Sequence, residues 1–145
     1  LIVQHGEIGA LDRIETAHQM RCPGQSLARA IGEKDKAVFF YRFSRVRPSE
    51  QGAKIGSYHG AEIPYIFDTH DSWLPTEETD RGLTDKMMAA WVAFARDGNP
   101  NPAVSWPEFG ETGQLLELGD QITFGTPWDS SLCPHLNAMD AVASE

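Results

Sequence analysis

His59 is the residue whose type and surroundings point most directly to chemistry. It stands between Gly56 and Gly60, in a loop that follows an apolar segment predicted to be a buried strand. Loops at the carboxyl ends of strands in an open α/β sheet are where catalytic groups gather, and an imidazole can act as a general base near neutral pH. Most loop histidines, however, are only solvated or hydrogen-bonded. These residues alone therefore favour a solvated or hydrogen-bonded His59 over a catalytic one.

Glu62 lies three residues after His59, where it could face the imidazole or cap a short helix over residues 63–67. Capping or another local hydrogen bond is the role that the pattern favours. A complete Ser-His-acid triad is not present, because the sequence contains no G-x-S-x-G nucleophile elbow. The strings closest to it, residues 24–26 and 56–60, place serine wrongly.

Metal or cofactor chemistry has no support in the sequence. The two cysteines, Cys22 and Cys133, are far apart, no Walker loop or G-x-G-x-x-G occurs, and the five histidines form no paired ligand spacing; they are His5, His18, His59, His70 and His135. We therefore expect no metal and no cofactor. The cysteines could be two buried thiols or one long-range disulfide, and their spacing does not decide between them.

The elements that must position His59 follow from hydrophobic patterning. The apolar run 37–43 predicts a strand buried on both faces. Residues 83–96 predict a helix that buries Met87 and Trp91, with Thr84 as its N-cap and Gly98 just past its end. Residues 68–82 predict a surface loop whose acidic run, Glu77, Glu78 and Asp80, is solvated.

Three further segments complete the pattern. Pro23 at a first helical position predicts a short helix that ends at Gly32. Residues 115–124 predict a hairpin that turns at Gly119 and Asp120. The last dozen residues carry no strong pattern, and nothing divides the chain into two domains.

The composition is typical of a globular protein, and the net charge argues against one class of partner. The 145 residues are 41% hydrophobic and carry 12 Lys+Arg against 21 Asp+Glu, a formal charge of −9. This charge argues against nucleic acid, since the densest basic cluster is only Arg42, Arg45 and Arg47. No apolar run is long enough to cross a membrane. The first residues resemble neither a signal peptide nor a natural protein start.

Residues 56–67, GSYHGAEIPYIF, resemble the histidine motif of the type-B carboxylesterases, the group that includes the cholinesterases. The resemblance spans roughly residues 16–133. It is reinforced, in the same order, by Arg21-Cys22-Pro23, Leu27-Ala28, Tyr41-Arg42-Phe43, Met87-Met88, Trp91, Phe94-Ala95-Arg96, Gly98-Asn99-Pro100-Asn101 and Trp106-Pro107.

The resemblance implies an α/β-hydrolase fold, with residues 1–145 as the C-terminal segment of a single, incomplete domain. It implies that His59 is the triad histidine, supported by Gly60 and Glu62, and that the substrate is a small-molecule carboxylic ester. The family's serine, its acid and its glycine-rich oxyanion segment lie upstream and have no counterpart here. An N-terminal remainder of the parent chain must supply them, so we expect the 145 residues alone to be inactive.

The resemblance also implies a disulfide between Cys22 and Cys133, although Pro134-His135 departs from the aromatic pair usual in that family. A disulfide implies an oxidising compartment, so the parent is expected to be secreted or periplasmic. Two alternatives remain. One is a catalytically inactive relative that serves as a binding or adhesion module, and the other is a structural module whose strand 37–43 pairs with another chain.

Overall fold

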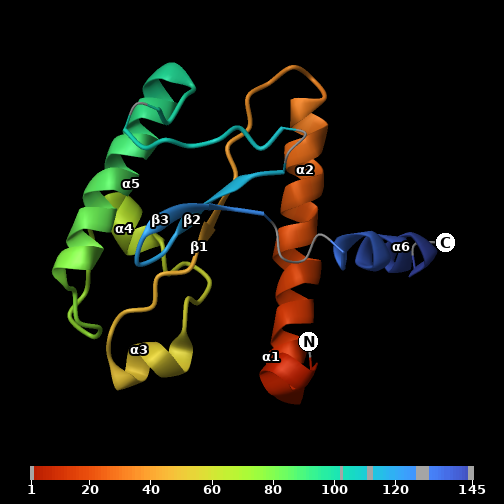
Figure 1. The fold of residues 1–145 in the computed structure, drawn as a ribbon, viewed down its shortest axis with the longest axis horizontal. Coiled ribbons are helices and arrows are strands. Elements are labelled where there is room, and N and C mark those ends of the chain that lie inside the picture. The colour runs from red at the N-terminus through yellow and green to blue at the C-terminus, as the bar shows by residue number, and fades with distance from the viewer. Residues whose placement is uncertain (1, 102, 111–112, 127–130, 144–145) are drawn as a thin grey trace. The chain divides into compact units, whose positions relative to one another are not determined.

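The computed structural model describes residues 2–101, 103–110, 113–126 and 131–143 (Figure 1). The chain forms two compact units. The terminal unit comprises Leu1–Val38 with Thr126–Glu145, and the central unit comprises Phe39–Gly125. Within the described residues, none of the helices combines the length and apolar character needed to cross a bilayer.

The terminal unit is helical. Helix α1 (Ile2–Thr16) continues through one π-helical segment, η1 (Ala17–Arg21), into α2 (Cys22–Gly32), and α6 (Cys133–Ala143) lies near the other end of the chain. The predicted helix ending at Gly32 is confirmed, whereas α1 and α6 were not predicted. Gly6, with φ 69°, interrupts the helical geometry inside α1.

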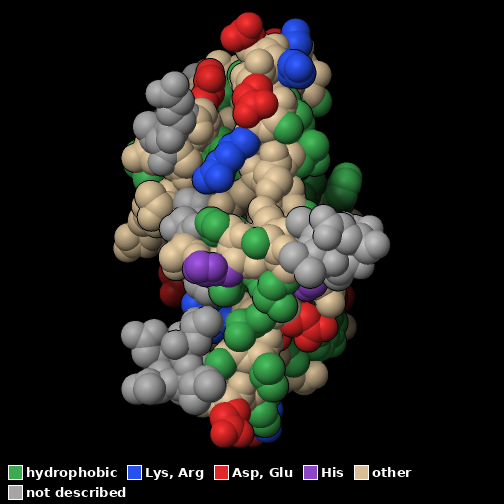
Figure 2. Space-filling view, turned by 90° about the vertical axis from the view of Figure 1, so that its right-hand side faces the viewer, with side chains coloured by type: hydrophobic (Ala, Val, Ile, Leu, Met, Phe, Trp, Pro, Cys, Tyr) green, Lys and Arg blue, Asp and Glu red, His purple; other side chains and the backbone are tan. Residues whose placement is uncertain are grey.

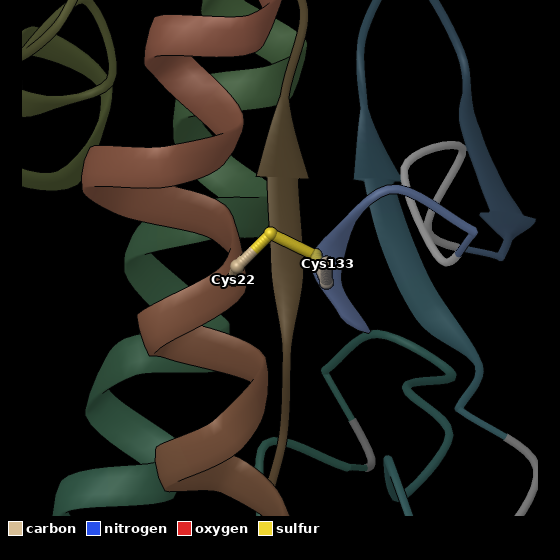
Figure 3. The surroundings of a disulfide bond; sticks show 2 residues. All are labelled: Cys22 and Cys133. Carbon is tan, nitrogen blue, oxygen red and sulfur yellow. A yellow bond between two sulfur atoms is a disulfide. The ribbon is translucent and has the colours of Figure 1, made fainter. Parts of the chain in front are cut away.

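A disulfide joins the first residue of α2 to the first residue of α6 (Figure 3). The Cα atoms of Cys22 and Cys133 are 5.2 Å apart, and both residues are buried beside Ala17 and Leu136. This pairing is the one that the family resemblance implies. It fastens α6, a segment whose sequence carries little helical pattern, to the long N-terminal helical run.

Large apolar side chains lie on the surface of this unit, and Figure 2 shows green side chains gathered along the face that it views. Ile8 is 85% exposed, Leu11 is 67% exposed and Leu27 is 61% exposed. Met139 on α6 is also exposed. These exposed side chains belong to α1, α2 and α6, and they are among the most exposed large apolar residues of the described chain.

The central unit contains a three-stranded sheet in the order β1-β2-β3. Strand β1 (Tyr41–Phe43) pairs in parallel with β2 (Leu115–Leu118), and β2 pairs antiparallel with β3 (Ile122–Gly125). The predicted hairpin is therefore confirmed. The prediction of a strand over 37–43 buried on both faces is wrong: β1 has three residues, all half-buried, because it pairs with one strand only among the described residues.

Three helices complete this unit: α3 (Glu50–Ile55), α4 (Ile63–Phe67) and α5 (Glu78–Asp97). The prediction of a helix ending before Gly98 is confirmed, and Gly98 has the left-handed φ of 68°. The predicted start is wrong, because Glu77 and Asp80 form a capping box that begins α5 before Leu83. Thr84 is thus not an N-cap but a buried residue inside the helix.

The core of the central unit lies between the sheet and helices α4 and α5 (Figure 1). It consists of Tyr65, Leu83, Met87, Ala90, Trp106, Leu116 and Leu118, with further aromatic side chains packed against them. Met87 is completely buried, as predicted. The rings of Tyr41 and Trp91 are 5.2 Å apart at their centroids, so β1 and α5 are joined by edge-to-face aromatic packing.

Candidate active site

His59 lies on an exposed turn between α3 and α4. Two residues before it, the Ser57 hydroxyl donates a hydrogen bond of 3.0 Å to the backbone carbonyl of Phe43, the last residue of β1. The loop is therefore tied to the carboxyl end of a strand, where the sequence places it. The His59 imidazole has no hydrogen-bond partner among the residues that the structure describes.

Local backbone geometry fixes the turn. The N–H of Ala61 donates to the carbonyl of Tyr58 at 3.0 Å, so His59 and Gly60 are the two central residues of a hydrogen-bonded turn. Gly60 has φ +87°, a conformation that L side chains rarely adopt. A Cβ at this position would make only an ordinary contact of 3.5 Å with Ile63, so conformation and not space requires the glycine.

Glu62 occupies the N-cap position of α4, but its side chain makes no capping hydrogen bond. The expectation of a side-chain cap is therefore wrong. Its backbone carbonyl begins the helix instead, accepting the N–H groups of Tyr65 and Ile66 at 3.0 and 3.1 Å. Burial raises the pKa of Tyr41, and the Glu62 carboxylate raises it further, so the charge of Glu62 acts on β1.

Asp80 is the centre of a buried network behind the turn, contrary to the prediction of a solvated acidic run. It is 0% exposed, and the Arg45 guanidinium donates to both of its carboxylate oxygens, from Nε at 2.8 Å and from Nη2 at 3.2 Å. The Tyr65 hydroxyl donates to Oδ1 at 2.6 Å and the Glu77 N–H donates to Oδ2 at 2.8 Å. Arg45 also binds Asp120 at 2.7 Å.

This network shifts the pKa values of Asp80 and Tyr65. Burial raises the pKa of Asp80, but hydrogen bonds from Arg45 and Tyr65 outweigh that effect and lower it to about 2. Burial, together with the hydrogen bond to Asp80, raises the pKa of Tyr65 to about 12. Asp80 is therefore a carboxylate and Tyr65 a neutral donor at neutral pH.

A second set of contacts surrounds His70. Arg47 Nη2 donates to His70 Nδ1 at 2.8 Å, because a guanidinium only donates. The Thr84 hydroxyl donates its proton to the Asp80 carbonyl at 2.8 Å, so His70 Nε2 donates to Thr84 Oγ1, also at 2.8 Å. These partners assign a neutral imidazole protonated on Nε2. The His70 ring lies edge-on to the Tyr65 ring, with centroids 4.8 Å apart.

Sequence reasoning missed this network, although two signals bear on it. The spacing of Glu77 and Asp80 fits a capping box, and the alternating Arg45 and Arg47 follow directly after β1. Arg42, the third residue of that basic cluster, pairs with Glu117 on the neighbouring strand. The basic cluster is therefore used for internal ion pairs.

Among the described residues, His59 is an exposed imidazole on a hydrogen-bonded turn. No carboxylate among the described residues hydrogen-bonds the His59 imidazole, and no group of three His, Cys, Asp or Glu there could hold a metal ion. An imidazole held on a fixed turn can accept and return a proton when a nucleophile reaches it.

Known proteins match this chain over most of its length. The sequence model of the Carboxylesterase family matches residues 6–133. Human carboxylesterase 3 is 32% identical over 110 residues, 66% of this chain and 19% of that protein. Acetylcholinesterase from Bungarus fasciatus is 30% identical over 150 aligned residues, 92% of this chain and 25% of that protein.

A solved structure, PNB esterase, matches with a TM-score of 0.56 and 27% sequence identity over 69% of this chain and 21% of that chain. The chain therefore spans about a fifth to a quarter of the length of the relatives that it matches.

Proposed function

Because this chain belongs to the carboxylesterase family and has an α/β-hydrolase fold, we propose that it supplies the catalytic histidine, His59, of a serine carboxylesterase. Residues 1–145 are then the C-terminal segment of one hydrolase domain. The rest of that domain supplies the nucleophilic serine, the acid that orients His59 and the donors of the oxyanion hole.

The mechanism assigns His59 two successive roles. As the serine Oγ bonds to the ester carbonyl carbon, His59 takes the hydroxyl proton. When the intermediate collapses, the bond to the alcohol oxygen breaks and His59 gives its proton to the leaving alcohol. Water then repeats both steps on the acyl-enzyme, releasing the acid and regenerating the serine.

One observation carries this proposal: an exposed imidazole without a partner in the described residues stands on a turn that hydrogen bonds hold on both sides. Ser57 ties the turn to β1, and Gly60 gives it the required left-handed φ. Gly60 is thus a supporting residue through its backbone. Glu62 supports the turn by opening α4 with its carbonyl, and it is not the triad acid.

Two further features are consistent with the proposal that this chain is part of a longer protein. The exposed apolar side chains of α1 and α2 are a surface for the N-terminal remainder to cover, consistent with a chain that spans about a quarter or less of its relatives. The Cys22–Cys133 disulfide favours an oxidising compartment, so we infer that the parent is secreted or periplasmic. Its substrate is a small-molecule carboxylic ester.

The test compares two histidine variants of the full-length protein on a p-nitrophenyl ester. His59→Ala should lower turnover by about 10⁴-fold or more, as loss of a triad member does. His135→Ala changes another exposed histidine on a different element and should leave turnover unchanged. Near-normal activity of His59→Ala would refute the proposal, and a parent with no serine at the elbow would identify a binding or adhesion module instead.

A further inference from the structure

A buried hydrogen bond joins the helix that follows His59 to helix α5: the Tyr65 hydroxyl donates to Asp80 Oδ1 at 2.6 Å. We propose that Tyr65 and Asp80 are positioning residues for His59: their hydrogen bond holds α4 in place, and α4 holds the turn that carries the imidazole. This inference rests on the proposed catalytic role of His59.

Backbone hydrogen bonds connect the turn that carries His59 directly to helix α4. Backbone hydrogen bonds run without a break from Tyr58 into α4, with Ala61 N–H bound to Tyr58, Ile63 N–H to Gly60, and Tyr65 N–H to Glu62, all at 3.0–3.1 Å. A shift of α4 therefore moves the peptide groups on both sides of His59. Ala61, two residues after His59, is itself buried, which restricts the turn further.

Helix α4 has a single deeply buried residue, Tyr65. Helix α4 is only five residues long, too short to be stable in isolation. Ile63 is 50% exposed and Phe67 is 67% exposed, whereas Tyr65 is 1% exposed. The Tyr65 ring packs against Phe43 of β1 with centroids 5.0 Å apart. Ile66 is half-buried and also packs against the core, but Tyr65 is the buried residue of α4 and the one whose side chain makes a buried hydrogen bond.

Asp80 is a buried and fully hydrogen-bonded carboxylate, and it serves as a fixed point for its neighbours. Its carboxylate accepts four hydrogen bonds, two from Arg45 after β1, one from Tyr65 on α4 and one from the N–H of Glu77 at the start of α5. One buried carboxylate therefore links three separate elements. A fully satisfied network of this kind is rigid, because every donor and acceptor has one good arrangement.

The Tyr65 hydroxyl is the group that links α4 to the Asp80 carboxylate, and through it to α5. Tyr65→Phe removes it while keeping the ring and its packing on Phe43 and His70. Asp80 keeps its two bonds to Arg45 and its capping bond. The domain should therefore stay folded while α4 loses its polar tie to α5, and the His59 turn gains freedom to leave the reactive geometry.

The test uses the full-length protein and a p-nitrophenyl ester at a temperature well below the Tm of every variant. We expect Tyr65→Phe to lower kcat about tenfold and to leave KM within twofold. Tyr41→Phe is the matched control, since Tyr41 lies in the same unit, is half-buried, and its hydroxyl has no hydrogen-bond partner among the described residues. Tyr41→Phe should leave kcat unchanged.

The decisive readout is the same substitution in a protein without His59. A residue that acts through His59 has nothing to position once the imidazole is gone, so Tyr65→Phe should not lower the residual rate of His59→Ala further. An equal tenfold loss in both backgrounds, or a fall in Tm with no change in kcat, would overturn the inference. If instead His59→Ala keeps full activity, the proposed function itself has failed.

Discussion

The guanidinium of Arg47 donates a hydrogen bond to Nδ1 of His70 at 2.8 Å, so the folded protein holds this imidazole as an acceptor beside a permanent cation. A proton on Nδ1 would abolish the hydrogen bond and place two cations in contact. His70 also binds Thr84 through Nε2 and packs on Tyr65. The imidazole therefore joins the loop after β1, helix α4 and helix α5 only while it is neutral.

This arrangement predicts a loss of stability in mild acid. Burial lowers the pKa of His70, and the charges of Arg47 and Arg81 lower it while those of Asp68 and Asp80 raise it. The unfolded chain, with a His pKa of about 6.5, then binds a proton at a higher pH than the folded chain does. The free energy of unfolding should therefore fall as the pH drops below that value.

Urea unfolding between pH 7.5 and 5.5 measures this contribution. His70→Gln keeps one acceptor and one donor, so the fall in stability over this range should become shallower in the variant. His135→Gln changes an exposed histidine on α6 and should behave like the wild type. Parallel pH curves for the wild type and His70→Gln would show that His70 is not held neutral.

A substitution at Gly60 should cost stability through backbone conformation alone. Its φ of +87° is unfavourable for any residue with a Cβ, and alanine there should lower the free energy of unfolding by about 1–2 kcal/mol. Gly82→Ala is the matched control. Gly82 lies inside α5 with open space around its Cβ position, so alanine there should stabilise the protein by about 0.5–1 kcal/mol. Similar changes in denaturation midpoint for both variants would contradict the assigned turn.

The disulfide should contribute a large part of the stability of the terminal unit. It closes a sequence separation of 111 residues, for which the chain-entropy model gives about 4–5 kcal/mol. We expect replacement of both cysteines by serine to lower the free energy of unfolding by about 2–5 kcal/mol. Adding a reductant should destabilise the wild type and leave the double variant unchanged. Equal unfolding curves for oxidised and reduced wild type would exclude this role.

Local patterns predicted the features whose causes are local. The glycines around His59 indicated a loop, Gly98 marked the end of α5, and Gly119 with Asp120 marked the hairpin. Each depends on the conformation of a few consecutive residues. The disulfide was different: spacing left it open, and only the family resemblance implied it.

Features set by distant partners could not be predicted in this way. The sequence around Asp80 does not distinguish it from the other acids of a polar stretch, because its partner Arg45 is 35 residues away in the sequence. The burial of β1 depends on its neighbours in the sheet. The apolar run therefore predicted a longer and more deeply buried strand than the structure has. Helix α6 has little pattern of its own and begins at the cysteine that bonds α2.

The central claim is that the imidazole of His59 performs the proton transfers, and chemical rescue tests it most directly. In the full-length protein, His59→Gly removes the imidazole and leaves a space at the turn. We predict that adding free imidazole raises p-nitrophenyl ester turnover by this variant at least tenfold, saturably, while the wild type and His135→Gly do not respond. A His59→Gly variant that keeps wild-type turnover without imidazole would contradict the account.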